Sequence, residues 1–513
     1  MIQHLCLIAL INLFIYYRTL SFNYVSDDVV VAAKTEPIPT DIWLFKWVTR
    51  FPKLLKLCIW INNKIPVKIR HELSNRLWNL HKLWLQLWGH RYFNPKHAHI
   101  LTLGLHILNC LLIYILLRNT PIAFTTALLF SINPVNMQGG SVWLSGKGYS
   151  MATTATLIMF IIPILAPLLY FAAPYLAPSA FFSPMAFLGT KFWFWIFLIP
   201  IFMKWGAMGK IIHNKVYNQP NKTVNTEMTI IKPRKIIPFI KTFGYYFILC
   251  IFPFKMGLYH KFLYGFGTNQ TDNKKGYKLT WSFWIGLLIM LWILAHIIYF
   301  HNLASWGLWW FCVNIAMWSN AKTIQQQVAE RYLYLPNIGM SIFVAFALQN
   351  HITLLAMLMT AYLVRLWYIM PSYTSDYWIV EYNTAEFKNL HYPWLIRGIK
   401  KYGIGDLKGA YHDFCEAHIH KPYDFKVLFN LSCATLMLGD FKNARHFFEE
   451  AKKFRYDEIE VDINPLFLAL ETEIKKAEEQ APTGKYCIDL ANVRVVKVLA
   501  FFFLYGISNI GMK

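Results

Sequence analysis

Long apolar runs alternate with shorter polar connections over most of the chain. Many of these runs approach 20 residues, the length with which an α-helix crosses about 30 Å of hydrocarbon. The segment 173–189 is also apolar but is broken by Pro and Gly, which suits a short or re-entrant crossing. We predict an all-α fold, a polytopic bundle of about ten or eleven transmembrane helices. The runs lie at 2–20, 98–117, 119–134, 151–172, 190–206, 237–253, 279–300, 303–318, 337–350 and 352–370.

The first loop, 21–97, interleaves Trp with Lys and Arg, chiefly over 41–90. Both residue types favour the boundary between membrane and water. The pattern predicts amphipathic helices that lie flat on the bilayer, and a soluble helical hairpin packed on the protein is the alternative. A last apolar stretch, 495–508, predicts a further membrane or interfacial helix.

The region 386–480 contains a repeat with a period of 34 residues: Gly398 aligns with Ser432, and Phe414 aligns with Phe448. This period and these residue types are typical of tetratricopeptide (TPR) units, which bind proteins or peptides. Two units and a capping helix at 464–480 are expected. The domain prediction is a membrane domain over 1–385, the TPR-like domain over 386–480 and a tail over 481–513.

Composition supports a membrane protein. Hydrophobic residues make up 56% of the 513 residues and charged residues only 15%, whereas soluble domains carry about 25% charged residues. The formal net charge of +23 is distributed beside apolar runs and among Trp, which favours membrane lipids or a lipid phosphate over nucleic acid as the partner. The eight cysteines include no C-x-x-C pair, so neither a zinc site nor a disulfide framework is predicted.

Two acidic residues, Asp27 and Asp28, follow the first apolar run directly. Carboxylates at a membrane boundary act as a general base or bind a divalent cation. The alternative is a pair of solvated residues at the end of a helix.

A second motif, Glu330-Arg331-Tyr332, opens a later membrane helix, where an arginine can hold a phosphate through two hydrogen bonds. Anchoring at the interface is the alternative for Arg331 and Tyr332. Lys147, in a turn rich in Pro and Gly, offers a point charge for an anion.

Histidine and lysine side chains supply further candidates. His106 lies in an apolar run, where a histidine serves as acid or base, binds a metal, or is hydrogen-bonded within the bundle. Lys204 and Lys255, with His260, are additional candidates for contact with a phosphate.

In their order along the chain, these motifs resemble the class C glycosyltransferases of the transmembrane-and-TPR, O-mannosyltransferase-like family. The resemblance covers about residues 1–456. The motifs are Asp27-Asp28, His106-Ile-Leu-Asn109, Asn133-Pro134-Val135, Trp143-Leu-Ser-Gly146-Lys147, Phe252-Pro253-Phe-Lys-Met-Gly257-Leu258, Glu330-Arg331-Tyr332-Leu-Tyr334-Leu-Pro336-Asn-Ile338-Gly339 and the repeat.

The resemblance implies transfer of a mannose-like sugar from a polyprenyl-phosphate donor to protein hydroxyls, on the extracytoplasmic face. Asp27 and Asp28 would supply the base, and Arg331 with nearby lysines would hold the donor phosphate. No cofactor is assigned, and the carboxylates of the acidic pair leave a divalent metal open. The membrane would be that of the endoplasmic reticulum or the bacterial inner membrane, with the TPR region on the extracytoplasmic side.

Departures from the family pattern leave a second hypothesis open. Asn133 stands where family members have His, and Tyr149 stands where they often have an acidic residue. The alternative is a catalytically inactive membrane scaffold that docks a partner subunit through its TPR units. A transporter is a third class, disfavoured because charged residues gather at helix ends.

Overall fold

The computed structural model describes residues 1–23, 25, 95–165, 169, 183, 186, 236–258, 279–320, 328–454 and 464–480. Throughout these ranges the regular structure is helical, and no β-strand occurs in them. The all-α prediction is therefore confirmed for the described part of the chain. The predicted helices at 41–90, 190–206 and 495–508 lie outside it.

Within the described ranges, four helical segments are long and apolar enough to cross a membrane. They are α1 with the 3₁₀ turn η1 (Ile2–Ser21), α6 (Pro95–Leu116), α13 (Trp281–Tyr299) and α16 with η10 (Ile352–Thr374). Shorter apolar helices are α7 (Ala123–Ile132), α11 (Ile236–Ile251), α14 (Leu303–Asn320) and α15 (Pro336–Ala347). These segments are compatible with an integral membrane protein.

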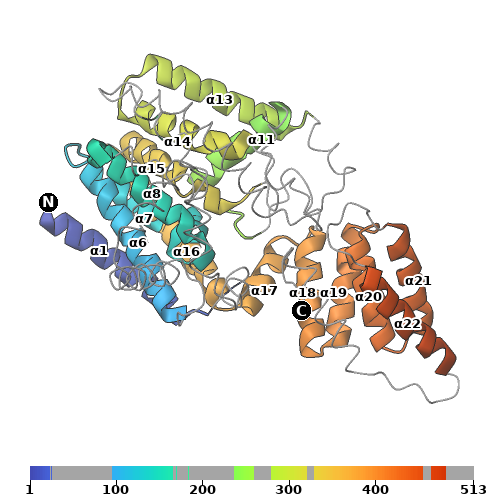
Figure 1. Cartoon of the computed structure of the whole chain (residues 1–513). Coiled ribbons are helices and arrows are strands. Elements are labelled where there is room, and N and C mark those ends of the chain that lie inside the picture. Colours follow the sequence, from blue (N-terminus) through green and yellow to red (C-terminus); the bar gives the residue numbers. More distant parts are fainter. Residues whose placement is uncertain are drawn as a thin grey trace, which may run out of the picture. The chain divides into compact units, whose positions relative to one another are not determined.

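The chain is organised in two compact units. Unit 1 consists of Met1–Tyr217, Phe300–Asn314 and Arg331–Ser375; unit 2 consists of Asn218–Tyr299, Ile315–Glu330 and Asp376–Lys513. In unit 1, α6, α7 and α8 (Lys147–Ile161) pack side by side, with α1 against α6 and α15 against α7 (Figure 1).

Helix α8 differs from the predicted run 151–172 at both ends. It begins at Lys147 and ends at Ile161, with Ile162 in a non-helical conformation (φ −127°, ψ 79°). Pro163 follows, and a proline disfavours the α conformation in the residue before it. The single long helix predicted here is therefore wrong, because the proline ends α8 after four turns.

Polar side chains connect the helices in the interior of unit 1. Tyr16 of α1 donates to the Ser131 carbonyl of α7 at 2.7 Å, and the Ser131 hydroxyl donates to Asn12 at 2.8 Å. All three residues are buried. Because hydrocarbon offers no hydrogen-bond partner, such contacts between helices satisfy polar groups that would otherwise be costly to bury.

In unit 2, α11 crosses α13 at two glycines. A Cβ on Gly244 would lie 2.5 Å from the Gly286 Cα, a distance that no side chain fits. Small residues at such a crossing allow two helix backbones to approach closely.

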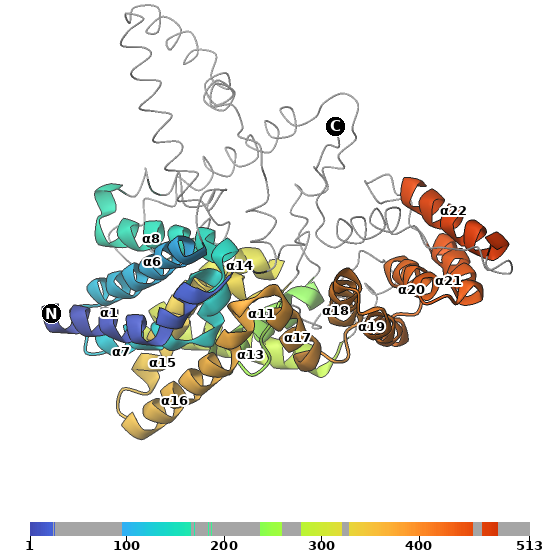
Figure 2. The same ribbon diagram turned by 90° about the horizontal axis from the view of Figure 1, so that it is seen from below.

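The C-terminal part of unit 2 is a series of packed helices. They are α17 (Asp376–Glu386), α18 (His391–Ile404), α19 (Leu407–His420), α20 (Phe425–Met437), α21 (Phe441–Lys453) and α22 (Asn464–Gln480). Each of α18 to α21 packs against the next, and α22 packs against α20 and α21 (Figure 2). The pairs α18–α19 and α20–α21 begin 34 residues apart, at 391 and 425.

Both helix pairs turn in the same way. Gly405 and Gly439 adopt left-handed backbone conformations with φ of 91° and 83°, which glycine reaches without steric cost. The next residues, Asp406 and Asp440, accept hydrogen bonds from backbone N–H groups in the first turns of α19 and α21. Each Gly-Asp step therefore ends one helix and caps the next.

Candidate functional site

The chain that leaves α1 is fixed to unit 1 at three points. The Phe22 ring lies edge-on to His99, with centroids 6.0 Å apart. The Asn23 N–H donates to the Thr374 carbonyl at 3.1 Å. The Val25 carbonyl accepts a hydrogen bond from Trp143 Nε1 at 3.3 Å. These contacts define the path of the chain up to Val25.

The predicted acidic pair, Asp27 and Asp28, begins two residues after Val25 and lies outside the described residues. Lys204 and His260 also lie outside them. Among the described residues, no group of three His, Cys, Asp or Glu side chains is arranged to hold a metal ion.

Arg331 lies among aromatic rings. Its guanidinium carbon is 5.3 Å from the centroid of the Trp143 ring and 5.2 Å from that of Tyr332. The Tyr149 hydroxyl interacts with the same guanidinium, and the Tyr149 and Tyr332 rings are 6.0 Å apart. Aromatic faces attract a guanidinium and hold its plane, so Arg331 is oriented by its surroundings.

Trp143 therefore contacts two predicted motifs at once. Its indole N–H bonds to Val25, at the end of the segment leading to Asp27, and its ring faces Arg331. Trp143 itself is buried. Sequence reasoning included it in a motif but gave it no role, since nothing local shows which residues a tryptophan will contact.

Lys147 is buried at the first turn of α8 and is electrostatically coupled to His99. The residue before it, Gly146, leaves no room for a side chain, because a Cβ would lie 1.8 Å from the Gln138 carbonyl oxygen. The turn before α8 is therefore tightly packed, and the residue that follows it, Lys147, is buried. Lys147 and Arg331 both belong to unit 1.

His106 lies within the bundle and both of its ring nitrogens have partners. Nε2 is 3.3 Å from the Ser131 carbonyl, and Nδ1 is 2.8 Å from the Tyr334 hydroxyl. A carbonyl only accepts, so Nε2 carries the proton and Nδ1 accepts from Tyr334. Of the alternatives weighed from the sequence, these contacts match a histidine hydrogen-bonded inside the bundle.

Tyr334 is the centre of this buried network, which the sequence did not reveal. Besides His106, its hydroxyl is 3.3 Å from Asn109 Nδ2 and 3.4 Å from the Ser150 hydroxyl. Its ring fills the space beside Gly139, where a Cβ would lie 2.4 Å from the Tyr334 Cβ. The segment after Arg331 is therefore inserted between α6 and the turn before α8.

Glu330, the neighbour of Arg331 in sequence, belongs to unit 2. Its Oε1 accepts a 2.6 Å hydrogen bond from the Gly257 N–H, and its side chain is buried. Glu330 therefore fixes the segment that carries Lys255, whose own side chain is exposed. The sequence placed Glu330 beside Arg331 as a candidate and did not indicate this contact.

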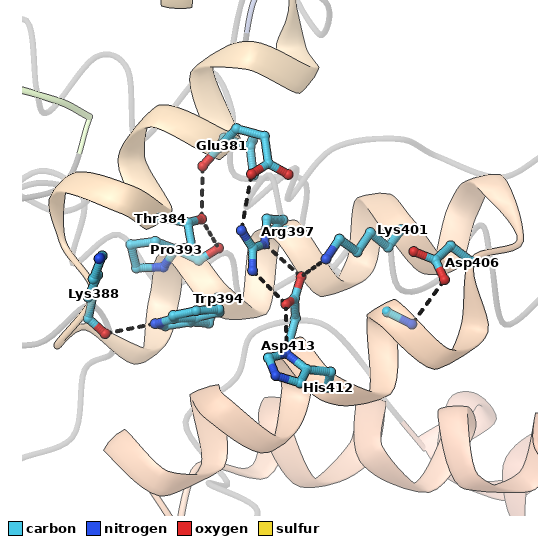
Figure 3. Close-up of polar contacts among 12 residues, drawn as sticks. Glu381, Thr384, Lys388, Pro393, Trp394, Arg397, Lys401, Asp406, His412 and Asp413 are labelled. Carbon is cyan, nitrogen blue, oxygen red and sulfur yellow. Dashed lines mark hydrogen bonds and ion pairs between the residues drawn. The ribbon is translucent and has the colours of Figure 1, made fainter.

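An ion-pair cluster around the buried carboxylate of Asp413 joins α17, α18 and α19, as Figure 3 shows. Arg397 donates two hydrogen bonds of 2.8 Å to Asp413 and one of 3.0 Å to Glu381. The Lys401 ammonium lies 3.0 Å from Asp413, and the Trp394 ring faces the guanidinium at 4.6 Å. Burial alone would raise the pKa of Asp413, but hydrogen bonds from Arg397 and Lys401 outweigh it and hold the pKa below its usual value.

Comparison of the chain with family models, with curated proteins and with solved structures found no match.

Proposed function

We propose that this chain is a multi-pass membrane glycosyltransferase that moves a mannose-like sugar from a polyprenyl-phosphate donor to protein hydroxyls on the extracytoplasmic face. The family resemblance of its motifs supplies the reaction type. One contact of the described residues carries the proposal further: Trp143 bonds to Val25 and faces Arg331.

The Trp143 contacts connect Arg331 to the segment of chain that leads to the acidic pair. Two residues of chain extend at most about 7 Å, so the backbone of Asp27 is within that reach of Val25. The segment that leads to the acidic pair and the guanidinium of Arg331 thus contact one tryptophan, which supports a site in which a proton is removed at one end and a phosphate is held at the other.

The proposed reaction proceeds in one displacement. An Asp28 carboxylate, with Asp27 beside it, accepts the proton of a Ser or Thr hydroxyl. The hydroxyl oxygen forms a bond to the anomeric carbon, and the bond from that carbon to the phosphate oxygen breaks. The lipid phosphate leaves with the electron pair, and Arg331 and Lys147 stabilise its charge. Lys204 and Lys255 are the further candidates that the sequence offers for contact with the donor phosphate. A divalent cation held by the carboxylates is the alternative use of the acidic pair.

The helix pairs α18–α19 and α20–α21 are proposed to be TPR units that bind the acceptor protein or a partner subunit. Their 34-residue offset and their glycine-aspartate turns support this assignment. With the N-terminus in the cytoplasm, the acidic pair and the TPR region face outside, in the endoplasmic reticulum lumen or the bacterial periplasm.

The test is sugar transfer by the purified chain in lipid nanodiscs, measured by mass spectrometry of acceptor peptides with a polyprenyl-phosphate sugar as donor. Loss of a general base lowers the rate about 10²- to 10⁴-fold, so Asp28→Asn is expected to lower kcat by that amount. Arg331→Gln is expected to lower it about 100-fold. Arg118→Gln, an exposed arginine of unit 1, is the control and retains activity.

Transfer at the wild-type rate by Asp28→Asn would remove the catalytic role of the acidic pair. The membrane scaffold that docks a partner through its repeat would then be the better account.

A further inference from the structure

Helix α13 gives unit 2 a reference for the level of the membrane. Its 19 residues are long and apolar enough to cross the bilayer. Trp281 and Tyr299, at its two ends, are 83% and 78% exposed. Trp and Tyr gather where hydrocarbon meets the polar head groups, so the Tyr299 end of α13 has the composition of a bilayer boundary.

Helix α11 runs parallel to α13, and the two helices end at nearly the same level. Gly244 packs on Gly286, and the Phe247 ring lies 6.1 Å from that of Trp292. The residue numbers therefore rise in the same direction along both helices. Beyond the second contact, α11 continues from 247 to 251 and α13 from 292 to 299, which are rises of about 6 and about 10 Å.

Two pairs of exposed aromatic rings lie beyond this level. Phe252 and Phe254 follow the end of α11 directly; they are 50% and 69% exposed, and their rings stack 5.9 Å apart. Tyr377 and Trp378 open α17, just after the apolar segment that ends at Thr374. They are 51% and 57% exposed, with ring centroids 5.3 Å apart. Exposed apolar surface of this kind marks a contact with a membrane or a partner.

Hydrogen bonds connect the two pairs within unit 2. The Tyr382 hydroxyl donates to the Met256 carbonyl at 2.9 Å, and the Leu258 N–H donates to Asn383 Oδ1 at 2.7 Å. Met256 comes two residues after the stacked Phe pair, at most about 7 Å of chain. Tyr382 comes one helical turn after the tryptophan, about 6 Å along α17. Both pairs therefore lie at the end of unit 2 where α11 and α13 end.

Helix α17 is also fixed to α18, the first helix of the repeat of α18 to α21. Arg397 donates a 3.0 Å hydrogen bond to Glu381, and the Lys400 ammonium lies 2.5 Å from Asp376. A surface that docks through α17 therefore carries the repeat with it.

We propose that Phe252, Phe254, Tyr377 and Trp378 form an interfacial surface that docks on the lipid bilayer and keeps the repeat at the membrane. The Phe rings contact the upper acyl chains, and the indole N–H and the phenol reach the polar region above them. The surface fits the boundary zone of the bilayer and selects no particular lipid, because apolar area and not charge supplies the attraction. The inference goes beyond the proposed function and does not depend on sugar transfer.

The first test is photocrosslinking of the full chain in phosphatidylcholine nanodiscs. Benzoylphenylalanine replaces Phe254 or Trp378, one at a time, and lipid adducts are measured by mass spectrometry after irradiation. Both variants are expected to form adducts, which fragmentation places in the glycerol and upper acyl region. The matched control replaces Tyr423, a 65% exposed aromatic residue between α19 and α20, and is expected to give background labelling only.

Three outcomes overturn the assignment. One is lipid labelling at positions 254 and 378 that is no higher than at 423. The second is crosslinking to another copy of the chain in place of lipid, which would assign the surface to self-association. The third is labelling that appears only when phosphatidylserine is added and disappears in high salt, which would assign the attraction to cations. Equal labelling with and without phosphatidylserine is expected.

The second test asks whether the surface keeps the repeat at the membrane. A donor dye is attached at Lys442, an exposed lysine of α21, and the head groups of the nanodisc lipids carry the acceptor. Energy transfer is expected to fall in the double variant Phe254→Ser with Trp378→Ser, and to stay at the wild-type level in Tyr423→Ser.

Hydrogen exchange of α18 to α21 is expected to be the same in the wild type and in both variants, which shows that the repeat remains folded. Wild-type energy transfer in the double variant would refute the proposed role of the surface. A fall in transfer together with faster exchange in α18 to α21 would assign the change to unfolding and would also refute it.

Discussion

Replacement of Arg397 by methionine tests whether the ion-pair cluster around the buried Asp413 stabilises the helices α17 to α19. The variant keeps most of the aliphatic volume and removes the guanidinium. Asp413 then loses two hydrogen bonds of 2.8 Å and keeps the Lys401 ammonium at 3.0 Å and the His412 ring nitrogen at 3.4 Å. Glu381 loses its 3.0 Å bond as well.

The expected loss of folding free energy in Arg397→Met follows from the burial of the ion pair with Asp413. The Asp413 side chain is fully buried and that of Arg397 is 18% exposed. Removing one partner of a buried ion pair costs about 3–5 kcal/mol, because the remaining charge stays buried. Lys401 still compensates part of the Asp413 charge, so we expect the low end, about 3 kcal/mol.

Arg445 provides a control with the same chemistry in a different environment. It donates two hydrogen bonds to Glu478, at 3.0 and 2.6 Å, but the two side chains are 25% and 40% exposed. Exposed pairs contribute about 0.2–1 kcal/mol. Arg445→Met is therefore expected to cost about 0.5 kcal/mol.

Hydrogen exchange of the full chain in nanodiscs measures how much stability each of the two variants, Arg397→Met and Arg445→Met, loses. Local opening free energies set the exchange rates of protected amides, and about 1.4 kcal/mol corresponds to a tenfold change. Peptides from α18 and α19 are expected to exchange about 100-fold faster in Arg397→Met, and peptides from α21 about two-fold faster in Arg445→Met. Peptides from α6 serve as the internal reference. Accelerations of similar size in the two variants would refute the argument that burial decides the contribution.

Three further predictions concern other parts of the fold. Tyr334→Phe removes a buried hydroxyl that donates to His106, and a hydrogen bond within a protein contributes about 0.5–1.5 kcal/mol. Thermal unfolding in detergent is expected to show a loss of about 1 kcal/mol, and an unchanged midpoint would contradict it. Gly339→Ala places a Cβ 2.2 Å from the Gly307 carbonyl oxygen, so the α14–α15 crossing is expected to open at a cost of about 1–3 kcal/mol, with a lower unfolding midpoint. The pKa of Asp413 is lowered in the folded protein, so its ion pairs stabilise the fold fully above about pH 4 and are lost as the pH falls through the folded-state pKa. Amide hydrogen exchange of α18, corrected for its intrinsic pH dependence, is expected to be constant from pH 7 to 5 and to rise only in stronger acid. A rise near pH 6 would assign the effect to another group.

Much of the helical architecture follows from local sequence. Apolar runs of about 20 residues predict helices because only a helix satisfies its own backbone in hydrocarbon, and α6, α13 and α16 lie close to the predicted positions. Gly405 and Gly439 mark turns because only glycine enters the left-handed conformation without strain. The end of α8 could also be predicted from the sequence, since Pro163 disfavours the helical conformation at the residue before it.

Candidate residues could be selected from the sequence, but their partners could not. Glu330 and Arg331 are adjacent in sequence, yet one bonds to Gly257 in unit 2 and the other faces Trp143 in unit 1. The period of the repeat placed Arg397 on a helix without indicating Asp413 as its partner.

The sequence by itself determined that the protein is helical, apolar enough for a membrane and repetitive near its C-terminus, because helix length, hydropathy and turn chemistry are properties of neighbouring residues. The tertiary structure alone decided which side chains meet. Contacts such as Trp143 with Val25, or Tyr334 with His106, join residues 118 and 228 positions apart. Their formation depends on how whole helices pack, and no local pattern carries that information.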